Sequence, residues 1–173
     1  ALWRSMTLER LVMPTRTASI NALALLHEFE QGPHGGFSPV PYRDSAGKPT
    51  IGWGHLIQPG EHFETPLTAA QADQLLHQDL KVAEAAVNKL VSVPITQSIF
   101  DALVCFAFNV GAANLSGSTL LFELNQRRYA VAANELLRWD KAYNPKTRKK
   151  EPLAGLIRRR EAERQLYLAE GFS

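Results

Sequence analysis

The feature that most limits the fold is a stretch between two helical segments, residues 33–60, that is too rich in proline and glycine to form a helix. Its prolines are Pro33, Pro39, Pro41, Pro49 and Pro59, interspersed with Gly35, Gly36, Gly47, Gly52 and Gly54. Proline lacks a backbone donor and glycine favours turns. We therefore predict two short strands, over 40–43 and 50–53, that the turn D-S-A-G-K joins into a hairpin.

Apolar residues recur at helical spacing on both sides of this stretch. A first helix is predicted from Ser19 to Glu30, where Gly32 and Pro33 end it. After residue 66 the pattern is helical. Thr68 and Gln71 form a capping-box pattern at the start of a helix over 68–91. Such a helix would span about 35 Å and could link two lobes.

The helix that follows is apolar on most sides, which predicts a place in the middle of the core. Pro94 suits its first turn and Gly111 suits its end. Shorter helices are predicted over 118–125, 129–139 and 155–169, with 144–152 as an exposed loop. The predicted fold class is therefore α+β, with a small β-hairpin lobe joined by a long helix to a larger helical lobe.

Length and composition fit one domain. A chain of 173 residues that is 45% hydrophobic can build one good core but not two independent ones. We interpret residues 13–173 as that domain and residues 1–12 as an appendage, either vector-derived or the stub of a removed segment. No apolar run approaches the ~20 residues of a membrane helix, and no secretory signal pattern is visible. These observations predict a soluble chain.

The single cysteine excludes an intrachain disulfide and a cysteine-based metal cluster. Cys105 lies in the apolar run A-L-V-C-F-A-F, which predicts that it is buried. Four histidines have no metal-ligand spacing with acids or cysteine: His27, His34, His62 and His77. We therefore expect neither a metal nor a cofactor.

Positive charge is concentrated near the end of the sequence. Residues 141–164 contain nine Lys or Arg against three Glu, although the net charge of the whole chain is only +2. Such a region could hold nucleic acid, an anionic envelope polymer or acidic lipid head groups, or it could be a solvated helix face. No nucleic-acid-binding motif accompanies it, so nucleic acid is the weakest of these partners.

Two carboxyl groups and a hydroxyl form the pattern with the clearest chemistry. Glycoside hydrolysis needs one protonated and one ionised carboxyl group. Glu30 ends the first predicted helix, where the helix dipole disfavours its ionised form. Asp44 precedes a glycine turn with free N–H groups and should stay charged, and Thr50 follows closely. By composition alone this pattern is common, because many helices end in Glu and many turns contain Asp.

Three segments, in the same order along the chain, resemble a known family of glycoside hydrolases. Residues 42–55, Y-R-D-S-A-G-K-P-T-I-G-W-G-H, resemble the hairpin signature of phage-type lysozymes, glycoside hydrolase family 24. Two further segments agree in order: F-N-V-G at 108–111 with S-T-L at 118–120 and L-N at 124–125, then G-L-I-R-R-R-E-A-E-R at 155–164. The resemblance runs from about residue 18 to the end. It implies a lysozyme-like fold and hydrolysis of the β-1,4 bond between N-acetylmuramic acid and N-acetylglucosamine.

The resemblance also assigns catalytic residues. The family's catalytic Asp and Thr fall on Asp44 and Thr50, with the usual five residues between them, and its Glu falls on Glu30 in E-F-E-Q-G. Thirteen residues separate Glu30 from Asp44, where the family usually has eight, and we interpret the surplus as a surface bulge. Glu28 is the rival acid. Side chains two apart on a helix point about 200° away from each other, so only one of these two Glu side chains can face the cleft.

Other positions are implied with less specificity. Leu56, Phe108 and Thr119 match positions that line the substrate cleft in the family, although each could also be plain packing. His55 is interpreted as structural, paired with Asp79 on the long helix. Tyr42, Trp53 and Phe37 could stack on sugar rings or simply form a small core.

The expected protein is a monomeric endolysin, made in the host cytoplasm and acting on peptidoglycan in the periplasm after release. Its basic C-terminal region could also contact anionic outer envelope. Two alternatives remain open. A lytic transglycosylase on a similar fold would need chiefly the acid, so Asp44 and Thr50 would be dispensable. A non-catalytic protein that binds the cell wall or a membrane would work through the basic helix.

Overall fold

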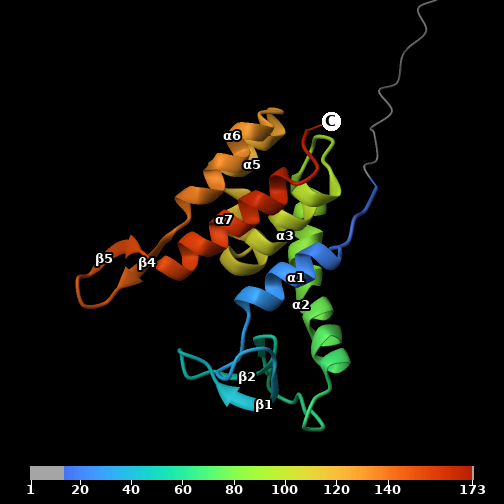
Figure 1. Ribbon diagram of the computed structural model, residues 1–173, viewed down its shortest axis with the longest axis vertical. Coiled ribbons are helices and arrows are strands. Elements are labelled where there is room, and N and C mark those ends of the chain that lie inside the picture. The colour runs from blue at the N-terminus through green and yellow to red at the C-terminus, as the bar shows by residue number, and fades with distance from the viewer. Residues whose placement is uncertain (1–13, 173) are drawn as a thin grey trace, which may run out of the picture.

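The computed structural model describes residues 14–172 and contains two lobes of unequal size (Figure 1). Its elements in chain order are α1 (Ile20–Phe29), β1 (Ser38–Arg43), β2 (Pro49–Gly52), β3 (His55–Leu56), α2 (Ala69–Leu90), α3 (Gln97–Val110), α4 (Ala112–Ser116), α5 (Thr119–Asn125), α6 (Tyr129–Glu135), the 3-10 turn η1 (Leu136–Arg138), β4 (Lys141–Asn144), β5 (Lys149–Pro152) and α7 (Ala154–Leu168). The predicted α+β fold class is confirmed. The predicted appendage, residues 1–12, lies outside the described residues.

The small lobe is an antiparallel sheet in the order β1-β2-β3. Tyr42 pairs with Thr50 across β1 and β2, and Thr50 pairs with Leu56 across β2 and β3. Directly paired residues share one face of a sheet, so these three side chains form one row. The lobe has a small core of its own, in which Ile51 packs with Leu67 and with Leu75 of α2.

Helix α1 connects the start of the described chain to the small lobe. The Ser19 side chain accepts a hydrogen bond from the Asn21 N–H, which caps the helix. Ser19 is itself held by the buried Asp101 of α3, which accepts from the Ser19 N–H at 2.9 Å. The helix ends at Phe29 with Glu30 as its C-cap, one residue from the predicted end, and Gly32 and Pro33 follow. This end places the Glu30 side chain between the lobes.

Helix α2 links the two lobes, as its length predicted. Both hydrogen bonds of the predicted capping box are present, between Thr68 and Gln71. Leu75 belongs to the core of the small lobe, whereas Leu76 and Leu80 belong to the core of the helical lobe. One helix therefore contributes to both cores and sets their relative position.

Helix α3 is the centre of the helical lobe. Ten consecutive residues, Ser98–Ala107, are buried, which confirms the central position predicted for it, and Cys105 is among them. Its predicted start was wrong. Pro94 lies before the helix, because the Thr96 hydroxyl accepts from the Ile99 N–H and begins the helix at Gln97.

Four short elements were not predicted. Residues 144–152, expected to be an exposed loop, form most of the antiparallel hairpin β4–β5, which projects beyond the start of α7 in Figure 1. Helix α4 and strand β3 have only five and two residues, too few for a periodic signal. The β4–β5 strands were missed because lysine-rich segments with flanking prolines lack the usual strand composition. Among residues 14–172, no helix has the length and apolar character needed to cross a membrane.

Candidate active site

Glu30 stands at the C-terminal end of α1, where its side chain turns toward α7. The side chain is 21% exposed, and its Oε1 accepts from Arg159 Nη1 at 2.6 Å. The rival Glu28 is exposed to solvent on another side of the helix. The local geometry therefore favours Glu30 over Glu28 as the acid that faces other polar groups.

Arg159 lies almost completely buried beneath Glu30. Its Nε donates to Glu163 Oε1 at 3.1 Å, and its guanidinium lies over the Phe29 ring. Glu163 is fully buried and also accepts from Arg160. Buried charges are tolerated only when paired, so this cluster holds Arg159 in place, and Arg159 in turn holds one oxygen of Glu30.

The other oxygen of Glu30 faces the small lobe. A Cβ atom built at Gly54 would lie 3.6 Å from Glu30 Oε2. Gly54 has a φ of +84°, a backbone conformation that glycine adopts without steric cost. The turn between β2 and β3 therefore approaches the carboxyl group closely, and Oε2 is the oxygen that remains available on this side.

Asp44 lies in the turn between β1 and β2. Its Oδ1 accepts from the N–H groups of Ala46 and Lys48 at 2.9 and 2.8 Å. Two backbone donors fix the side chain in the turn. They leave Oδ2 without a hydrogen bond from the described residues.

Tyr42 is influenced by the charges of both carboxyl groups. Burial, followed by the negative charges of Asp44 and of Glu30, raises the pKa of the Tyr42 phenol. Both carboxyl groups therefore lie near the same phenol. On the same sheet face, Thr50 is 2% exposed and its hydroxyl donates to the Lys48 carbonyl at 3.1 Å.

The residues predicted to bind substrate all lie at the surface. Leu56 is exposed and shares its sheet face with Thr50 and Tyr42. Phe108 is half-buried near the end of α3, and Thr119 is exposed in the first turn of α5. The structure brings Leu56 close to the proposed catalytic hairpin, whereas Phe108 and Thr119 lie on the helical lobe.

Two histidine clusters tie the small lobe to the helices. His55 Nδ1 lies 2.9 Å from Asp79 Oδ1, and its Nε2 lies 3.0 Å from Glu61 Oε2. Burial lowers the pKa of His55, but hydrogen bonds to Glu61 and Asp79 outweigh it and raise the pKa above its ordinary value.

The second cluster was not predicted. The His27 ring stacks on Trp53 with ring centres 4.1 Å apart, and Trp53 Nε1 donates to Asp73 Oδ1 at 2.8 Å. His27 Nε2 also lies 2.9 Å from Asp73 Oδ1, but it is not aligned as a hydrogen bond. Trp53 therefore joins the small lobe to α1 and α2. Stacking on a sugar ring was the alternative role considered for it.

Sequence reasoning missed the role of Arg159. The sequence places Arg159 only within the basic region 141–164, as one cation among nine. In the structure Arg159 and Arg160 are buried and paired with Glu163, whereas Arg158 is exposed. The missing signal was spatial, because Arg159 and Glu30 are 129 positions apart.

The arrangement combines a carboxyl group with one free oxygen, a second carboxylate fixed by backbone donors, and a hydroxyl on the adjacent strand. Within residues 14–172, no group of three or more His, Cys, Asp or Glu side chains is arranged to hold a metal ion. These groups could protonate a leaving oxygen and stabilise positive charge on a sugar.

Known proteins with similar sequences are lysozymes and endolysins of phages. The family model for phage lysozyme matches residues 32–163, which include Asp44 and Thr50 and begin just after Glu30. The endolysin of Salmonella phage P22 is 39% identical over 131 residues, which are 74% of this chain and 85% of that protein. Several further relatives, 32% to 38% identical, are named SAR-endolysins.

Two other comparisons concern length and fold. The endolysin of Bacillus phage B103 is 42% identical over 123 residues, which are 69% of this chain, and the match covers only 43% of that protein. The solved endolysin from Escherichia coli O157:H7 phage FAHEc1 has a TM-score of 0.80 and 33% identity, over 92% of this chain and 98% of that one. This chain therefore belongs to the phage lysozyme family and is a lysozyme-type glycoside hydrolase.

Proposed function

We propose that this chain is an endolysin that hydrolyses the β-1,4 bond between N-acetylmuramic acid and N-acetylglucosamine in peptidoglycan and so lyses the host cell. Glu30 is the general acid, Asp44 is the ionised partner, and Thr50 orients the attacking water. The observation that carries this assignment is the placement of Glu30, which Arg159 holds by one oxygen while the other faces Gly54, in the β2–β3 turn of the sheet that also bears Asp44 and Thr50.

The two oxygens of Glu30 have different environments, which determines where the proton resides. Arg159 donates to Oε1, so the proton of the neutral acid belongs on Oε2. Oε2 faces Gly54 and the small lobe, where the glycosidic oxygen would lie. Protonation of that oxygen breaks the bond to the sugar without releasing an alkoxide.

Asp44 and Thr50 act on the opposite side of the sugar. Asp44 Oδ1 is occupied by two backbone donors, which leaves Oδ2 to stabilise the oxocarbenium-like state and to accept a proton from water. The Thr50 hydroxyl donates to the Lys48 carbonyl, so its lone pairs can accept a hydrogen bond from that water. Attack from this face inverts the anomeric carbon.

Product analysis tests this chemistry. Digestion of purified peptidoglycan should give fragments heavier by one water than the anhydro products of a transglycosylase. Proton NMR of the fresh product should show the α-anomer first. Anhydro-muramic ends, together with normal activity of Asp44→Asn, would instead support the lytic transglycosylase alternative, for which the structure offers no specific observation.

We also propose that the enzyme works as a monomer, made in the host cytoplasm and released to act on peptidoglycan in the periplasm. The phage endolysins among its relatives support this cellular role. Cell fractionation during lysis, with activity appearing in the periplasmic fraction, tests the location. The basic C-terminal region is proposed to contact an anionic part of the envelope.

A further inference from the structure

The β4–β5 hairpin carries most of the accessible positive charge of the basic region. Residues 141–152 contain five cations and one acid, a net charge of +4 in a chain whose total is +2. The cations are Lys141, Lys146, Arg148, Lys149 and Lys150, and all five are exposed. In Figure 1 the hairpin projects away from the helical lobe, so a large polymer can reach it.

Most of the cations that follow in α7 form contacts within the protein. Arg159 and Arg160 are buried and share Glu163. Arg164 Nε donates to Asn134 Oδ1 at 2.9 Å. The basic region predicted from the sequence therefore divides into a structural part in α7 and an exposed part on the hairpin.

The two faces of the hairpin differ. Lys141 pairs with Pro152, and Tyr143 pairs with Lys150, so these four residues share a face, and all four are exposed. Tyr143 is 62% exposed between the two lysines. On the opposite face, Ala142, Asn144 and Glu151 are half-buried, and Lys149 is exposed. The exposed face thus combines cations with an aromatic ring that can lie against a sugar or peptide.

Asn144 organises the tip before any ligand arrives. Its Oδ1 accepts from the Lys146 N–H at 2.9 Å, and its carbonyl accepts from the Arg148 N–H at 2.8 Å. Its Nδ2 donates to Glu151 Oε2 at 2.7 Å. The only acid of the hairpin therefore holds the turn from the half-buried face. Lys141 is paired with the neighbouring Asp140 at 3.2 Å, whereas no ion pair with the described residues holds Lys146, Arg148, Lys149 or Lys150.

The hairpin is also close to the active site along the chain. It leads directly into α7, and Arg159 follows Pro152 by seven residues, about 10 Å of helix. Arg159 holds Glu30. A glycan strand bound across Glu30 could therefore extend to the hairpin.

We propose that the β4–β5 hairpin is an accessory binding arm for the substrate polymer itself, whose stem peptides carry free carboxylates. This inference rests on the proposed peptidoglycan hydrolysis. The cations attract those carboxylates, and Tyr143 contacts the chain that bears them. Each exposed charge pair contributes little and is screened by salt, so the arm works through the sum of several weak contacts. It should therefore affect KM for intact wall more than kcat.

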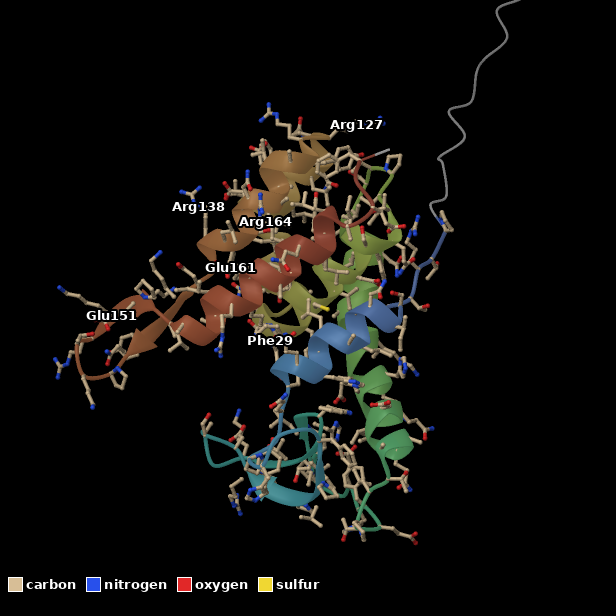
Figure 2. All side chains as sticks on the ribbon, in the orientation of Figure 1. Phe29, Arg127, Arg138, Glu151, Glu161 and Arg164 are labelled. Atoms are coloured by element: carbon tan, nitrogen blue, oxygen red, sulfur yellow. The ribbon has the colours of Figure 1, made fainter. Side chains whose placement is uncertain are left out.

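Two matched variants test the arm. Lys146→Gln, Arg148→Gln and Lys149→Gln together remove three charges from the tip. Lys81→Gln, Lys89→Gln and Arg127→Gln remove two lysines and one arginine from exposed positions on α2 and before α6. Arg127 and Arg148 both have positive φ, at 61° and 56°, so the two triples are matched in this respect too. In Figure 2, Arg127 lies far from Glu151 of the hairpin.

The measurements are KM and kcat for release of reducing ends from purified peptidoglycan at 50 and 300 mM salt, and co-sedimentation of each protein with that wall. At low salt the tip triple should raise KM and weaken sedimentation by roughly tenfold. The control triple should change either by less than about twofold, and high salt should remove the difference. Wall whose carboxylates have been amidated should bind wild type and the tip triple equally.

Several results would overturn the proposal that the hairpin binds the wall. Equal effects of both triples would mean that only net charge matters. Unchanged wall binding by the tip triple, with lost binding to phosphatidylglycerol vesicles or to DNA, would assign the hairpin to a membrane or to nucleic acid. If wild type releases no reducing ends, the proposed function fails, whereas a failure of the arm alone leaves wild-type hydrolysis intact. If the tip triple melts early, Lys146→Gln alone is compared with Lys81→Gln.

Discussion

At Gly54, the absence of a side chain leaves open the space beside the Glu30 carboxyl group. The position an added Cβ would take is in contact with Oε2, the oxygen assigned to the transferred proton. The glycine-rich hairpin is predictable from the sequence, but the contact of this glycine with an acid from another element is not. The reason is that α1 and the hairpin meet only in the folded molecule.

We predict that Gly54→Ala lowers activity on peptidoglycan by roughly ten- to a hundredfold, because the methyl group would lie against Oε2 and exclude the glycosidic oxygen from that side of the carboxyl group. Gly60→Ala is the control, since Gly60 has a similar φ of +87° but open space around it. Both variants should lose about 1–2 kcal/mol of stability from backbone strain. Equal activity of the two variants, at equal stability, would contradict the proposed role of Oε2.

The buried carboxylate of Glu163 gives a second prediction at this scale. Glu163→Gln removes the negative charge between Arg159 and Arg160 and should cost about 3–5 kcal/mol in the free energy of unfolding. Glu161→Gln, an exposed position on the same helix, should stay within about 0.5 kcal/mol of wild type. Urea titrations measure both. A cost below 1 kcal/mol for Glu163→Gln would show that the cluster does not depend on this carboxylate.

At the scale of single elements, the capping and breaking signals predicted the helices well. Thr68 with Gln71 marked the start of α2 to within a residue, and Gly32 with Pro33 marked the end of α1. These signals are local, so sequence alone carries them. The β4–β5 hairpin escaped prediction because its strands are held by backbone pairing and by the Asn144 turn rather than by apolar alternation. The partnership of Arg159 and Glu30 escaped for a different reason, its long sequence separation.

The contact between β3 and α2 should depend on pH. Because the pKa of His55 is raised, the folded protein binds that proton more tightly than the unfolded chain does. The resulting stabilisation is complete below about pH 6.5, the ordinary value for histidine, and is lost as pH rises through the folded pKa. Thermal melts from pH 5.5 to 8.5 should show the advantage of wild type over His55→Gln shrinking with pH. His77→Gln, at an exposed position on α2, should melt like wild type at every pH. If the stability advantage of wild type over His55→Gln instead grew with pH, the stabilising role of protonated His55 would be contradicted.

At the scale of the whole molecule, the two lobes have unequal cores. The helical lobe buries twenty-five apolar residues around α3, whereas the small lobe has a cluster of three. Local opening costs less free energy where fewer apolar contacts must be broken. The small lobe is therefore the part of the molecule that is able to open while α3 stays folded.

Native-state hydrogen exchange tests this difference. Amides of β2 should exchange through openings several kcal/mol below the free energy of global unfolding, while the central amides of α3 should exchange only through global unfolding. Similar protection in β2 and in α3 would show instead that α2 couples the lobes into one cooperative unit.

The proposed hydrolysis depends on Glu30 acting as the proton donor, with Arg159 holding one of its oxygens. The most direct test is the rate at which purified peptidoglycan loses turbidity with wild type, Glu30→Gln and Glu28→Gln at equal, verified folded concentration. Glu30→Gln should lower the rate by at least about a hundredfold, given what general acid catalysis contributes, while Glu28→Gln stays within about twofold of wild type. A Glu30→Gln enzyme that clears peptidoglycan at the wild-type rate would contradict the account.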